Sequence, residues 1–89
     1  MNAPARITMP HEDEFSSAAR DELASIRDRA ARGAHNATDS AAVFLGEIAR
    51  LATFAAVSHR PASDLIRINS ALKFAMEAAR AIDRVTRHG

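Results

Sequence analysis

Apolar residues recur at intervals of three and four along almost the whole chain, and they never alternate as they would in a half-buried strand. Two stretches interrupt this spacing, one around Gly33 and one at His59-Arg60-Pro61. The dipeptides that favour tight hairpins, Asn-Gly and Asp-Gly, do not occur. The spacing therefore predicts an all-α fold with no sheet, in which three helices over about 11–32, 37–58 and 63–87 form a single domain of residues 11–89.

Local signals place the ends of these helices. Residues 1–10 are predicted to be a disordered lead-in, because proline disfavours helix in the residue before it and nothing periodic is present there. Gly33 suits a left-handed C-cap for the first helix. Asn36 and Ser63 suit N-caps for the second and third helices. Gly46, in the middle of the second helix, is expected to mark a close approach of another helix, because glycine there otherwise costs about 1 kcal/mol.

The second and third helices each carry a seam with the alternating three- and four-residue spacing of a heptad repeat. The link between them is short, about five residues, so we expect an antiparallel αα-hairpin preceded by the first helix. A dimeric helical bundle and a monomeric three-helix bundle would both use these stripes. The seam positions are Ala37, Ala41, Phe44, Ile48, Leu51 and Ala55 on one helix and Leu65, Ile68, Leu72, Ala75, Ala79 and Ile82 on the other.

Large apolar side chains are scarce in this chain. Of its 89 residues 47% are hydrophobic, but 21 of these are alanine and two of the three methionines lie in the predicted lead-in. A chain of this length with about 19 large apolar side chains barely offsets the entropy lost on folding. We therefore expect a homodimer or a higher oligomer. The hypothesised dimer seam consists of Phe44, Ile48, Leu51, Leu65, Ile68 and Leu72.

Charge and cysteine content narrow the class of protein. The net charge is +1, from 12 basic and 11 acidic residues, which weighs against a dedicated nucleic-acid binder. The chain has no cysteine, which excludes disulfides, zinc fingers and iron–sulfur clusters and fits a reducing cytoplasm. No signal peptide and no membrane-spanning stretch of about 20 apolar residues is evident. The eleven arginines against one lysine, together with the alanine enrichment, are typical of a GC-rich bacterial coding sequence.

No catalytic, cofactor-binding or metal site is expected. The four histidines lie near predicted helix ends, and neither His-x-x-x-His nor Glu-x-x-His spacing occurs. Three glycines cannot supply a phosphate-binding loop, and no serine has a nearby base. Glu47 and Arg50, three residues apart in the most apolar helix, are interpreted either as a surface pair or as polar contacts that fix the register of an interface.

These exclusions leave a small non-catalytic protein-binding module, such as an adaptor, regulator or inhibitor. Phe15, Leu23 and Ile26 are the hypothesised partner surface, because the first helix has the thinnest apolar stripe, and the sequence leaves open whether that helix is docked or mobile. One alternative is a nucleic-acid-associated regulator that uses a basic face of the last helix. Acidic residues interleave that face, and no Tyr or Trp is present for base stacking. A ligand-binding bundle is the second alternative. The hypothesised nucleic-acid face consists of Lys73, Arg80, Arg84 and Arg87.

Overall fold

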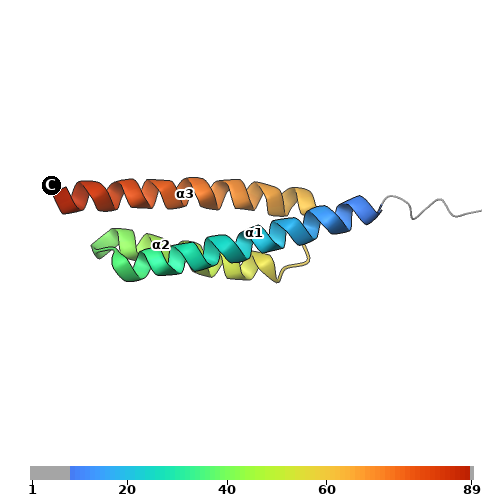
Figure 1. Ribbon diagram of the computed structural model, residues 1–89, viewed down its shortest axis with the longest axis horizontal. Helices are drawn as coiled ribbons and strands as arrows, with labels where there is room; N and C mark the ends of the chain where they lie inside the picture. The colour runs from blue at the N-terminus through green and yellow to red at the C-terminus, as the bar shows by residue number, and fades with distance from the viewer. Residues whose placement is uncertain (1–8, 89) are drawn as a thin grey trace, which may run out of the picture.

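The computed structural model describes the backbone of residues 9–88 and the side chains of residues 13–87. It contains three α-helices, α1 (Met9–Asn36), α2 (Asp39–Ala56) and α3 (Ala62–His88), and no strand occurs within these residues. The three helices lie side by side, and each runs back along the one before it (Figure 1). The prediction of an all-α fold of three packed helices is therefore confirmed.

Helix α1 is longer than predicted at both ends. It begins at Met9, so the predicted lead-in was wrong for residues 9 and 10, and the rest of that prediction, residues 1–8, lies outside the described residues. It also continues through Gly33 to Asn36, and the backbone of Gly33 is not left-handed. The chain turns instead at Thr38, the N-cap of α2, and at Asp39, whose φ is 49°.

The core is built from one stripe of each helix, and nearly half of its side chains are alanine. The small side chains allow the helices to approach closely, and the largest fully buried residues, Leu23, Ile26, Leu45 and Leu65, fill the space between them. The cluster comprises Ala19, Leu23, Ile26, Ala30, Leu45, Ile48, Ala52, Ala55, Leu65, Leu72, Met76 and Ala79.

Helix α1 is an integral part of this core, whereas the sequence left open whether it is docked or mobile. It packs against both other helices, most extensively against α2. Its predicted stripe is buried from Ala19 to Ala30. The stripe was judged weak because it holds few large residues, but alanine at a close helix contact loses little side-chain entropy and permits dense packing.

The close approach of helices that was expected at Gly46 occurs at Gly33 instead. A Cβ atom on Gly33 would lie 3.2 Å from Cδ1 of Leu45, so it is Gly33 that allows α1 and α2 to approach closely. A Cβ atom on Gly46 would meet nothing within 4 Å, and the expected close approach at that residue is therefore wrong.

Side chains from α1 and α3 hold both ends of α2. At its N-terminus, Oδ1 of Asp83 accepts hydrogen bonds from the backbone nitrogen and the Oγ1 of Thr38, at 3.2 and 3.3 Å. At its C-terminus, Arg20 donates to the carbonyl oxygens of Ala56 and Ser58, at 2.6 and 2.8 Å. A negative charge at a helix N-terminus and a positive one at its C-terminus both complement the helix dipole.

Candidate interaction surface

The side of α2 and α3 that faces away from α1 carries an open apolar groove, which we call the α2/α3 groove. It consists of two hollows in series, of about 300 and 380 Å³. Phe44, Leu51, Phe54 and Ile82 form its walls and remain between 38% and 59% exposed. One hollow is lined by Phe44, Glu47, Ile48, Ala75, Ala78, Ala79 and Ile82, and the other by Leu51, Phe54, Ala55, Ser58, Arg60, Ile68 and Leu72.

Residues seven positions apart produce this groove. Phe44 and Leu51 are spaced in this way on α2, as are Ile68, Ala75 and Ile82 on α3. Seven residues make nearly two helical turns, so each set lies on one side of its helix. Ile48 on α2, and Leu65, Leu72 and Ala79 on α3, lie three or four positions away and are buried in the core. Each helix therefore has two adjacent apolar stripes, and only one of them is covered within the chain.

The six residues of the hypothesised dimer seam divide between these two stripes. Leu65 is fully buried in the core, so its assignment to an interface between copies was wrong. Ile48 and Leu72 are also core residues, 5% and 7% exposed, and they form the floor of the groove. Phe44 and Leu51 are groove walls, and Ile68 is half-buried beside them.

The hypothesised partner surface on α1 does not form. Leu23 and Ile26 are 0% exposed, because they face α2 and α3 across the core, and no partner can contact them in this fold. Phe15 is 55% exposed and stays at the surface without the two neighbours assigned to it.

Two of the four cations of the hypothesised nucleic-acid face are engaged within the chain. Lys73 forms an ion pair of 2.8 Å with Glu22, and this hydrogen bond lowers the pKa of the Glu22 carboxyl below its usual value. Arg87 pairs with Asp83 at 2.8 Å and also donates to the carbonyl oxygen of Asn36.

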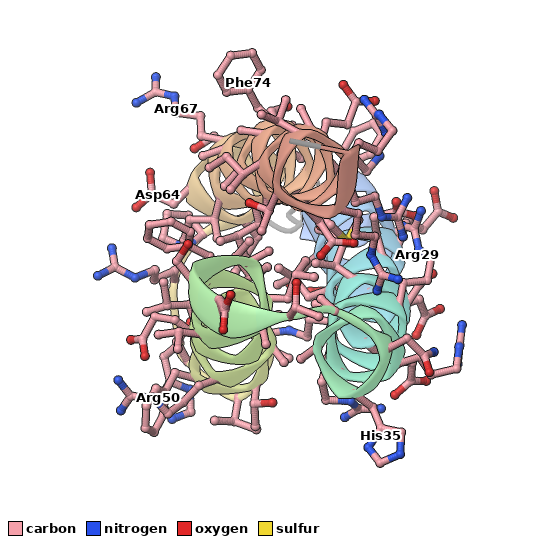
Figure 2. All side chains as sticks on the ribbon, turned by 90° about the vertical axis from the view of Figure 1, so that its left-hand side faces the viewer. Arg29, His35, Arg50, Asp64, Arg67 and Phe74 are labelled. Atoms are coloured by element: carbon pink, nitrogen blue, oxygen red, sulfur yellow. The ribbon has the colours of Figure 1, made fainter. Side chains whose placement is uncertain are left out.

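The other two cations of that face, Arg80 and Arg84, have no ion pair in the described part of the chain. They share a shallow surface hollow with Glu77 and Phe74. Figure 2 shows Phe74 projecting from α3 away from the other two helices. The face therefore offers two arginines without an ion pair next to an acidic residue, which is a weak site for a phosphate backbone.

Charged residues flank the α2/α3 groove but hardly enter it. Glu47 and Arg50 form an exposed pair on α2, and Arg50 also lies 6.0 Å from the ring centroid of Phe54. Arg60 and Asp64 form a loose pair of 3.7 Å at the start of α3. Figure 2 shows Arg50 projecting outward from α2.

Five residues of the hypothesised dimer seam line the groove, namely Phe44, Ile48, Leu51, Ile68 and Leu72, whereas Phe54, Arg60 and Ile82 were not among the predicted site residues. For Ile82 the signal was present, because it continues the seven-residue spacing of Ile68 and Ala75. Phe54 lies off the heptad seam, and Arg60 lies in the link between α2 and α3, so neither had a periodic signal.

The described residues contain neither a candidate metal site nor a candidate membrane span. No group of three or more potential metal ligands occurs among them. None of the described helices is both long and apolar enough to span a membrane. Comparisons of the chain with protein-family models, with curated proteins and with solved structures find no match.

Proposed function

We propose that this protein is a small non-catalytic protein-binding module that acts as a homo-oligomer, and that its copies associate through the α2/α3 groove. The observation that carries the proposal is the exposed apolar surface of the groove. Among its lining residues only Glu47, Ser58 and Arg60 are polar. An apolar surface of this extent, with polar residues at its ends, is typical of an interaction site.

The size of the groove suits an interface. If a whole phenylalanine buries roughly 200 Å² and leucine or isoleucine somewhat less, the exposed parts of Phe44, Leu51, Phe54 and Ile82 amount to about 350 Å². A standard interface buries about 800 Å² per partner, of which about 65% is apolar in homodimers. These four side chains therefore supply most of the apolar area that a stable interface needs.

The shape of the groove favours a helix over a small ligand. Its two hollows follow each other along α2 and α3 and are open to solvent along one side. Small-molecule sites, in contrast, usually enclose most of the surface of their ligand. An elongated apolar groove between two helices fits the apolar stripe of another helix.

Substitution of a groove wall tests the proposal. We expect the wild-type chain to sediment as a dimer or larger species at micromolar concentration and Leu51→Asp to sediment as a folded monomer, because a buried carboxylate without a partner opposes association. Phe44→Ser, at the other hollow, gives the same result and serves if Leu51→Asp loses helix by circular dichroism. Phe74→Asp is the matched control, since Phe74 is 76% exposed and lies outside the groove.

A single-chain mass of 9.6 kDa for the wild type would contradict the proposal. So would an unchanged mass for Leu51→Asp and Phe44→Ser, because association would then use another surface.

A further inference from the structure

The two charged residues that line the α2/α3 groove lie toward its opposite ends. Glu47 lines the hollow near the N-terminal half of α2, and Arg60 lines the hollow beyond the C-terminus of α2. Thirteen positions separate them, nine along α2 to Ala56 and four in the link to α3. One hollow of the groove is therefore lined by a carboxylate and the other by a guanidinium, with apolar residues between them.

This charge pattern is complementary to itself in one orientation only. In a two-fold dimer the same surface of each copy contacts the other. An axis along the groove would place the two copies parallel, and each charge would meet its own equivalent. An axis perpendicular to the groove places them antiparallel, and each end then meets the end of opposite charge.

We propose that a second copy of this chain covers the α2/α3 groove in the antiparallel orientation, with Glu47 of each copy facing Arg60 of the partner subunit. The inference rests on the proposed self-association through the groove and adds its orientation. Phe54 lies between the two charged residues in the sequence and is 59% exposed in the single chain, so its ring is expected near the two-fold axis.

The ion pairs within each chain do not oppose this arrangement. Glu47 pairs with Arg50, and Arg60 with Asp64, on exposed surface where such pairs contribute little to stability. In the antiparallel dimer these four groups come together at each end of the interface and carry balanced charge. In a parallel dimer, Glu47 would instead face Glu47 of the partner subunit and Arg60 would face Arg60 of the partner subunit, and only the pairs within each chain would offset the repulsion.

A second copy also fits the groove better than an unrelated partner does. The apolar walls run along most of α2, and the helix that matches this length and this seven-residue spacing is α2 itself. An unrelated partner would place no constraint on the charges at the two ends. If each end of the groove contacts the opposite end of a second copy, the two charged residues, Glu47 and Arg60, are expected to have opposite signs.

Cysteine cross-linking tests the orientation, because the chain has no cysteine of its own. We expect an equimolar mixture of Glu47→Cys and Arg60→Cys chains to form a disulfide-linked dimer under mild oxidation, whereas each variant alone does not. The short reach of a disulfide makes the result specific for neighbouring positions. Cross-linking of either variant with itself would overturn the antiparallel orientation in favour of the parallel one.

Charge reversal tests the same contacts by affinity. We expect Glu47→Arg and Arg60→Glu each to raise the dissociation constant of the dimer by about tenfold or more at low salt. We expect the double variant to return to within about threefold of the wild type. The matched controls, Asp21→Arg and Arg67→Glu, reverse exposed charges that lie outside the groove and have no ion pair in the described residues, and they leave the affinity unchanged.

The outcomes separate the two proposals. If Leu51→Asp dissociates the oligomer while the single reversals have no effect, self-association through the groove stands and the orientation is refuted. The orientation is also refuted if the double reversal fails to restore affinity with helix content intact. If the wild-type chain is monomeric, both proposals fail together. The cysteine pair keeps the test decisive if a reversed charge disturbs folding.

Discussion

Asn69 on α3 is the one polar side chain that the described part of the chain buries in its core, where it is 7% exposed. Its Nδ2 donates to the carbonyl oxygen of Ala19 on α1 over 3.2 Å. Its Oδ1 has no hydrogen-bond partner among the described residues. Exchange of the two amide atoms would bring an oxygen against that carbonyl, so the assignment stands. A buried acceptor without a partner costs about 1–3 kcal/mol.

We therefore expect Asn69→Leu to stabilise the protein. The substitution removes the unsatisfied acceptor and buries an apolar side chain on the same side of α3 as Leu65 and Leu72, which lie one turn away, and Met76, which lies two turns away. Against this it loses one neutral hydrogen bond, about 0.5–1.5 kcal/mol, and it requires some repacking at about 1–3 kcal/mol. The burial itself contributes about 1.5–3 kcal/mol. The free energy of unfolding should rise by about 1 kcal/mol, and the Tm by roughly 4–8 °C.

Urea unfolding followed by circular dichroism measures this change, at two protein concentrations so that association and folding can be separated. Asn69→Asp is the control, because it keeps the shape but buries a carboxylate, and it should lower the stability by several kcal/mol at neutral pH. A lower stability for Asn69→Leu would refute the reasoning. It would mean that Oδ1 has a partner, such as an ordered water, whose loss outweighs the apolar gain.

Three further predictions follow from the contacts between helices. Gly46→Ala should stabilise the fold by up to about 1 kcal/mol in thermal unfolding, and Gly33→Ala should gain less than this, because its new methyl group would lie 3.2 Å from a methyl of the buried Leu45, which must shift to make room. Arg87 lowers the pKa of Asp83, so this carboxylate's stabilisation should be lost as the pH falls below about 4, and Asp83→Asn should flatten that part of an acid titration. Arg20→Met should cost about 1.5–3 kcal/mol and speed amide exchange first at the C-terminal turn of α2.

The sequence predicted the three helices because their apolar spacing is long and regular, but it misjudged how the stripes are used. Phe44 and Leu65 both lie on heptad seams, and one faces solvent while the other is fully buried. Periodicity shows that a helix has two apolar sides. It does not show which side faces α1, because that depends on how three helices pack together.

The helix ends were misjudged for a related reason. Gly33 is a local signal for a helix end, but in the fold it serves the contact between α1 and Leu45, and the helix continues for three residues beyond it. The N-cap residue of α2, Thr38, is likewise held by hydrogen bonds to Asp83, which is 45 residues away in the sequence. Contacts over this distance override local propensity and leave no local pattern in the sequence.

The way α2 is held has a consequence for the groove. Asp83 from α3 fixes its N-terminal end and Arg20 from α1 fixes its C-terminal end, so α2 can slide little along either neighbour. The groove walls Phe44 and Leu51 are therefore carried by a helix whose axial position is set before any partner arrives. A preformed groove loses little conformational entropy on association, which raises the affinity obtained from a given apolar area. The polar contacts at the two ends of α2, which take no part in the groove itself, thus favour association through it.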